Sequence, residues 1–131
     1  MKLIYPAIFT PWDEGEGYTV VVPDLPGCVS EGGSLEEAIE MATDAASGWV
    51  LDELEDGSTI PQSSRPQDIT ADGESFVNLL VLDMAAYSEK YGSKTVRKNI
   101  TIPAWLNAYG EKNHINFSKV LQESLLAMTK S

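Results

Sequence analysis

The stretch from Thr95 to Pro103 constrains the fold most, because two kinds of side chain alternate along it. Val96, Lys98, Ile100 and Ile102 would lie on one side, and Thr95, Arg97, Asn99 and Thr101 on the other. Side chains switch faces at every residue of a strand, so the pattern predicts a strand over residues 95–102. Pro103 cannot donate to a ladder and suits the first turn of a helix, so the strand should end there.

A strand in this position has no partner later in the chain, because only two short helical patterns follow it. One strand and two short helices have no core of their own, so the strand must pair elsewhere. The simplest partner is a second copy of the same strand, antiparallel about a two-fold axis. We therefore expect a homodimer joined by a two-stranded ribbon, or a higher oligomer built from such dimers.

The outward face of this ribbon would present Arg97, Asn99 and Thr101 from both chains. Parity places Lys98 on the inner face, so we exclude it despite its charge. A two-stranded ribbon with polar side chains on one surface has the shape of a reader of the DNA major groove. We therefore predict Arg97, Asn99 and Thr101 as base or backbone contacts.

The second helical pattern begins after Asn116, a suitable N-cap. The free N–H groups of Phe117 and Ser118, with Lys119 beside them, predict phosphate contacts, because helix N-termini attract anions. His114, in the turn before this helix, is expected to be structural.

Apolar residues of the ribbon and both helices should interlock two chains. The predicted dimer core comprises Ile100, Ile102, Trp105, Leu106, Val120, Leu121 and Leu125.

Residues 99–103, the helix that follows and the turn over residues 115–118 resemble the ribbon-helix-helix family of DNA-binding proteins. The first helix, expected over residues 104–112, is about one turn shorter than is usual in that family. The resemblance implies a β-α-α domain over residues 94–131 that dimerises and binds DNA.

The preceding residues predict an α/β (α+β) body with the order β-β-β-α-β, one sheet with one long helix on a face. The strands are expected over residues 3–10, 18–22, 29–32 and 76–82, and the helix over residues 35–55. Ser34 and Glu37 form a capping box, and Gly57 should end the helix. The last strand is apolar enough to be central and covered on both faces. The body should span residues 1–83, and residues 84–93 should form a linker or short helix.

The formal charge of −11 is unevenly spread along the chain. Residues 1–93 contain three basic and 18 acidic residues, which gives −15, whereas residues 94–131 contain six basic and two acidic ones, which gives +4. This split predicts two partners of opposite charge. The body should attract a basic partner and repel nucleic acid, and the tail should do the reverse.

Four segments of the body resemble the HicB antitoxin family. They are Tyr5-Pro6-Ala7, Gly17-Tyr18-Thr19-Val20, Pro23-Asp24-Leu25-Pro26-Gly27-Cys28 and Gly33-Ser34-Leu35-Glu36-Glu37-Ala38. With the tail, the resemblance covers nearly the whole chain. It implies a degenerate RNase-H-like body and a protein antitoxin. Such an antitoxin inhibits a small basic mRNA-cleaving toxin of the HicA type and represses its own operon through the tail.

The body is not expected to be an enzyme. Nuclease chemistry of the RNase-H kind needs several carboxylates that converge on two metal ions. The available acids are Asp24, Glu31, Glu37, Asp44 and Asp83, and no two can be placed together without assuming the fold. We therefore predict no catalytic residue, no metal site and no cofactor.

A cytoplasmic protein is expected, because the single Cys28 fits a reducing compartment and no apolar run reaches the ~18 residues that span a bilayer. One alternative is a ribbon-helix-helix transcription regulator whose acidic body senses a small ligand or another protein. A basic protein encoded by the neighbouring reading frame would favour the antitoxin.

Overall fold

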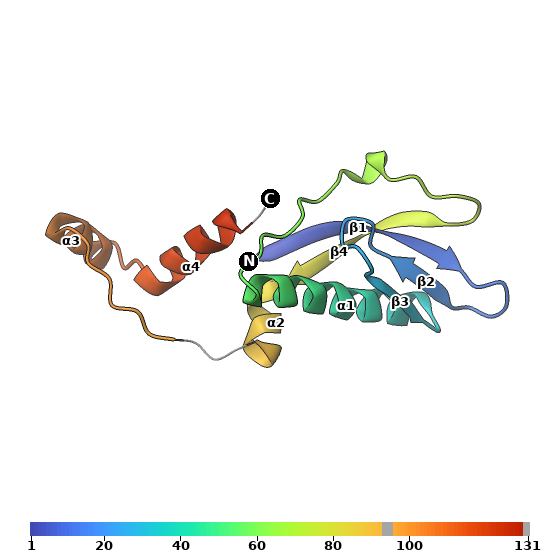
Figure 1. The fold of residues 1–131 in the computed structure, drawn as a ribbon, viewed down its shortest axis with the longest axis horizontal. Coiled ribbons are helices and arrows are strands. Elements are labelled where there is room, and N and C mark those ends of the chain that lie inside the picture. Colours follow the sequence, from blue (N-terminus) through green and yellow to red (C-terminus); the bar gives the residue numbers. More distant parts are fainter. Residues whose placement is uncertain (93–95, 130–131) are drawn as a thin grey trace.

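The computed structural model describes residues 1–92 and 96–129, and the fold of the body is a four-stranded antiparallel sheet with a long helix on one face (Figure 1). The strands are β1 (Lys2–Pro11), β2 (Tyr18–Val21), β3 (Val29–Gly32) and β4 (Phe76–Asp83). The helices are α1 (Leu35–Glu55), the 3-10 turn η1 (Pro66–Asp68), α2 (Met84–Tyr91), α3 (Ala104–Lys112) and α4 (Phe117–Met128). The expected β-β-β-α-β order of the body is confirmed.

The core lies between β1 and α1. Alternate residues of β1 face the helix, and Tyr5, Ala7 and Phe9 among them are at most 2% exposed. Four-residue spacing along α1 presents a stripe of small residues to them, and this stripe consists of Ala38, Ala42, Ala46 and Val50. Side chains this small let the helix lie close to the sheet, which is how the larger residues of β1 are covered at native packing density.

Both ends of α1 follow the sequence expectation, with one correction. Ser34 caps the helix by accepting a hydrogen bond from the Glu37 N–H at 3.1 Å. The Glu37 carboxylate, however, accepts from the Gly33 N–H at 3.2 Å and not from Ser34, as a standard capping box would require. Gly57 follows the helix with a φ of +79°, the left-handed conformation in which glycine commonly stops a helix.

The prediction that the last strand is central and covered on both faces is wrong. The strand order is β3-β2-β1-β4, so β1 is interior and β4 lies at an edge. Leu79 and Val81 of β4 are 44% and 53% exposed on the side away from the core. The uninterrupted apolar run of β4 indicated a buried strand, but its pairing with β1 alone leaves one face and one edge uncovered.

The connection from α1 to β4 is fixed to the sheet by two polar contacts. Asp24, in the β2–β3 turn, accepts hydrogen bonds from the Ser64 backbone N–H at 2.8 Å and from the Ser64 hydroxyl at 2.6 Å. The Tyr5 hydroxyl donates to the Pro61 carbonyl at 2.6 Å. Burial raises the pKa of Tyr5, and the nearby Asp24 carboxylate raises it further. The segment passes the sheet on the side opposite α1 in Figure 1.

The tail contains α3 and α4 at the expected positions, but its expected strand joins no ladder. Residues 96–103 form neither helix nor strand in the described part of the chain, and Thr95 lies outside it. A strand needs a neighbouring strand to complete its hydrogen bonds, and all four strands of the body belong to its own sheet. The end of α4 returns to the body, where the Ile60 N–H donates to the Thr129 carbonyl at 2.7 Å.

Replacing Gly32 with alanine should destabilise the body, because a Cβ there would overlap the backbone nitrogen and Cα of Ala38 in the first turn of α1. We expect a loss of about 1–3 kcal/mol in the free energy of unfolding, as for other overpacked sites. Gly33→Ala is the matched control, because nothing lies within 4 Å of its added Cβ. Urea unfolding followed by circular dichroism measures both, and equal stability of the two variants would contradict the packing described.

Candidate functional site

The three predicted base-reading residues lie together in the segment that leads into α3. Arg97, Asn99 and Thr101 are all exposed, and none has a hydrogen bond or ion pair within the described part of the chain. Their guanidinium, amide and hydroxyl groups are therefore available to a partner molecule. The single chain does not order them into a strand, so their common face is still a prediction.

His114 lies in the turn between α3 and α4, and the hydrogen bonds of this turn account for its backbone conformation. The His114 N–H donates to the Glu111 carbonyl at 3.2 Å, and the Ile115 N–H donates to the Gly110 carbonyl at 2.9 Å. This pair of bonds forms a Schellman motif, in which the residue after the cap adopts a left-handed conformation. His114 has a φ of +54°, so it occupies the position that glycine usually takes. The backbone of His114 therefore ends α3, and a structural role for its side chain stays a prediction.

The start of α4 has the geometry expected of an anion site. The Asn116 side chain accepts a hydrogen bond from the Lys119 N–H at 3.0 Å, which confirms the predicted N-cap. The Phe117 ring packs on Gly110 of α3, where any Cβ would overlap it, and this contact fixes the angle between the helices. The backbone N–H groups of Phe117 and Ser118 then stand at the open end of the helix. The Lys119 side chain borders a hollow of about 270 Å³ between α4 and the body.

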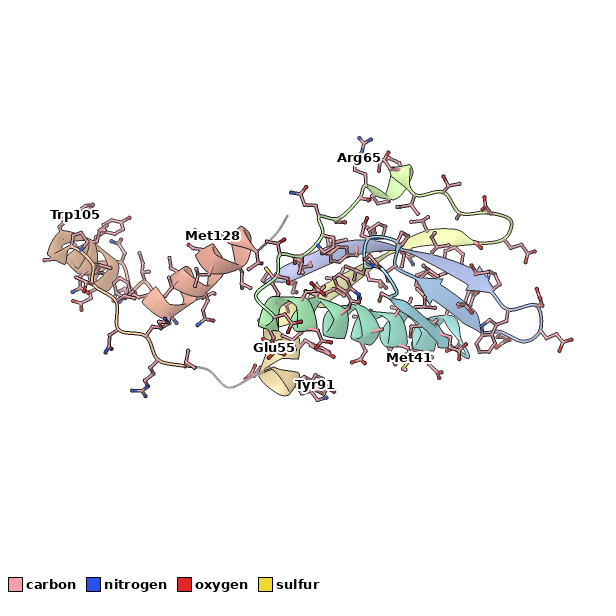
Figure 2. All side chains as sticks on the ribbon, viewed as in Figure 1. Met41, Glu55, Arg65, Tyr91, Trp105 and Met128 are labelled. Atoms are coloured by element: carbon pink, nitrogen blue, oxygen red, sulfur yellow. The ribbon has the colours of Figure 1, made fainter. Side chains whose placement is uncertain are left out.

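The predicted dimer-core residues are uncovered in the single chain. Trp105 is 71% exposed, Ile100 58%, Leu125 53% and Val120 50%, and Leu106, Leu121 and Ile102 are 36–39% exposed. Trp105 lies on α3, the part of the tail farthest from the body in Figure 2. Val96, on the expected inner face of the ribbon, and Met128, on the apolar stripe of α4, are 80% and 73% exposed as well. An apolar surface this continuous marks an interaction site.

Three of the five acids considered for catalysis are occupied by structural contacts. Asp24 holds Ser64, Glu37 accepts from Gly33, and Asp83 caps α2 by accepting from the Ala86 N–H at 3.1 Å. In residues 1–92 and 96–129, no three His, Cys, Asp or Glu side chains lie close enough to hold a metal ion. Cys28 is buried, and burial raises the pKa of its thiol, which makes it an unreactive core residue.

No helix within residues 1–92 and 96–129 combines the length and the apolar character that crossing a membrane requires.

His114→Gly should stabilise the tail, because glycine adopts the left-handed conformation without the cost of about 1–2 kcal/mol that other residues incur. We expect a gain of about 1 kcal/mol or less, and no gain from His114→Ala, which keeps a Cβ. Hydrogen exchange at the amides of α3 and α4 measures the change. Faster exchange in His114→Gly would mean that the imidazole itself supports the turn.

Comparisons with known proteins identify the family. The model of the family described as HicB_like antitoxin of bacterial toxin–antitoxin systems matches residues 5–124. Among curated proteins, the chain is 34% identical over 91 residues to an "Uncharacterized 14.9 kDa protein in rep-hol intergenic region" of Haemophilus phage HP1, covering 70% of this chain and 68% of that protein. It is 42% identical over 57 residues to Antitoxin HicB 1 of Photorhabdus laumondii, covering 44% of this chain and 36% of that protein.

Solved structures share the arrangement of the whole chain. One comes from a toxin–antitoxin complex of Streptococcus pneumoniae, with a TM-score of 0.60 and 25% identity over 98% of this chain and 99% of the other. Another is the antitoxin HicB of Burkholderia pseudomallei, with a TM-score of 0.63 and 26% identity over 95% and 96%. With the match of the family model to most of its length, the chain belongs to the HicB-like antitoxin family of bacterial toxin–antitoxin systems.

Proposed function

We propose that this antitoxin inhibits a small basic mRNA-cleaving toxin of the HicA type and represses its own operon. Residues 1–83, a degenerate RNase-H-like body, bind the toxin. Residues 94–131 dimerise as a ribbon-helix-helix domain and bind operator DNA, and residues 84–93 connect the two. The observation that carries the proposal is the family membership, which spans residues 5–124 and so includes both parts.

A protein toxin as partner is supported by a relative and by charge. The similar streptococcal chain comes from a toxin–antitoxin complex. The body's charge of −15 would raise the rate of association with a basic protein and would make that rate fall as salt is added. The same charge disfavours nucleic acid as the body's ligand.

Operator binding by the tail is supported by its positive charge and by its uncovered apolar surface. A second copy would supply the missing strand beside residues 96–102 and would cover Ile100, Ile102 and Leu106. The ribbon formed in this way would carry six outward side chains, two each of Arg97, Asn99 and Thr101. Arginine suits guanine and asparagine suits adenine in the major groove.

Toxin inhibition is tested by co-expressing the full chain with the basic protein encoded by the adjacent reading frame. Growth arrest caused by that protein should be relieved, and the two should co-purify as a complex that weakens as salt rises, because opposite charges attract. Residues 1–83, expressed alone with the same protein, locate the activity in the body. Persistent growth arrest with the full chain, or no complex, would refute the toxin assignment.

The ribbon is tested by comparing Arg97→Ala and Lys98→Ala, two adjacent substitutions that remove one positive charge each. Arg97→Ala and Asn99→Ala should each lose about 1–3 kcal/mol of preference for the operator over unrelated DNA, because they remove base contacts. Lys98→Ala should retain that preference. Titration against promoter DNA and a scrambled duplex measures the ratio.

The dependence of DNA binding on salt distinguishes phosphate contacts from base contacts. Lys119→Ala should weaken binding to both duplexes and lower the slope of log affinity against log salt by about one to two per dimer. If Arg97→Ala and Asn99→Ala bind the operator as the wild type does while sedimentation shows an intact dimer, the ribbon does not read the DNA.

A further inference from the structure

Two adjoining hollows lie between α1 and α2, with volumes of about 490 Å³ and 370 Å³. Asp44 and Tyr87 line both of them, and the smaller hollow also borders the turn before β3 at Gly27, Cys28 and Val29. We call the pair of hollows the α1–α2 groove. Figure 2 shows Tyr91 on α2, beside α1 and away from the sheet. The groove lies in the body and shares no residue with the predicted DNA-binding surface of the tail.

Gly48 forms part of the groove wall, and its missing side chain makes room for a tyrosine. A Cβ on Gly48 would lie 3.0 Å from the Tyr87 hydroxyl oxygen, so this hydroxyl rests against bare helix backbone. Asp44 and Asp52 are four residues to either side of Gly48, and this spacing places all three on one face of α1. The Tyr87 hydroxyl is therefore flanked by two carboxylates.

The groove carries a net negative charge, because Glu40, Asp44, Asp52 and Asp83 line it and Lys90 is the one basic residue among its lining residues. Burial raises the pKa of Tyr87, and Asp44, Tyr91 and Asp52 raise it further. Within residues 1–92 and 96–129, neither Asp44 nor Asp52 forms an ion pair or a side-chain hydrogen bond. Both acids are exposed, so a ligand reaches them without displacing any part of the protein.

The aromatic wall of the groove already holds a cation. The Lys90 ammonium lies 5.2 Å from the centroid of the Tyr91 ring, within the range of a cation–π contact. The Tyr91 and Tyr87 rings lie against each other, with centroids 4.8 Å apart. Carboxylates beside aromatic rings suit an arginine side chain, because its guanidinium both pairs with carboxylates and stacks on aromatic faces.

We propose that the α1–α2 groove is the toxin-binding site of the body and that it receives basic side chains, arginine foremost, from the toxin. This inference rests on the proposed function and adds to it the surface that is used. The opposite charges of the acidic body and a basic toxin favour this occupant. A second copy of this body carries −15 and would be repelled, as would DNA phosphates.

The test compares two double variants of the full chain that each remove two negative charges. Asp44→Asn/Asp52→Asn removes the two carboxylates that flank Tyr87, whereas Asp13→Asn/Glu14→Gln neutralises the exposed β1–β2 loop, where neither side chain has a described partner. The probe is the basic protein encoded by the adjacent reading frame, titrated by calorimetry at several salt concentrations. Circular dichroism verifies that each variant is folded.

We expect the groove variant to bind the toxin at least ~10-fold more weakly than the loop variant, with a shallower dependence on salt, because it loses close charge pairs and not only long-range steering. Tyr91→Ala, which removes an exposed ring, should weaken binding in the same direction. Toxin binding should also slow hydrogen exchange in residues 39–52 and 83–91.

The possible outcomes distinguish a failure of the groove proposal from a failure of the proposed function. Equal affinities of the two double variants, or protection from exchange elsewhere in the body, would overturn the groove while leaving the antitoxin assignment intact. Altered self-association of the groove variant without altered toxin binding would assign the groove to a second copy. Absence of toxin binding by the wild-type chain would refute the proposed function itself.

Discussion

The packing of the alanine stripe of α1 against β1 is the contact on which the rest of the body depends. Ala38, Ala42 and Ala46 are almost fully buried against the inner face of the sheet. Because these side chains are short, α1 lies close to β1, and the end of β3 meets the first turn of α1 at Gly32. Another face of α1 carries Asp44, Gly48 and Asp52, and there Gly48 approaches Tyr87 of α2.

The tail depends on a different constraint, which is the absence of a strand partner. All four strands of the body pair within its own sheet, and none of them pairs with the segment over residues 96–103. Its apolar residues stay uncovered, Ile100 and Trp105 among them. Folding of the ribbon is therefore coupled to dimerisation in our proposal, so DNA binding depends on protein concentration.

Much of the fold followed from the sequence because it depends on local patterns. The spacing of apolar residues and the cap at Ser34 predicted α1 over its full length, and the alternation in β1 predicted that strand. The position of β4 could not be predicted in the same way, because strand order is a matter of long-range pairing. An apolar run such as Phe76–Asp83 fits either a central strand or an edge strand with one face that the body does not cover.

The candidate sites show the same difference between features set by neighbouring residues and features set by long-range contacts. The cap at Asn116 was predictable, because a few neighbouring residues determine it. The left-handed conformation of His114 was not predicted. The α1–α2 groove was not predicted, since it joins Asp44 and Asp52 to a tyrosine far along the chain. The sequence signal for it is Gly48, because a glycine inside a helix costs about 1 kcal/mol and therefore indicates close packing, which in the structure is the approach of Tyr87.

In our proposal one chain binds a basic protein through its acidic body and DNA through its basic tail. Sedimentation velocity of the full chain, mixed with both the adjacent basic protein and operator DNA, tests whether the two ligands bind at the same time. Separate surfaces predict a single heavier species that contains all three components. Displacement of the basic protein by the DNA, without a ternary species, would show that the two ligands compete for one surface and would contradict the account.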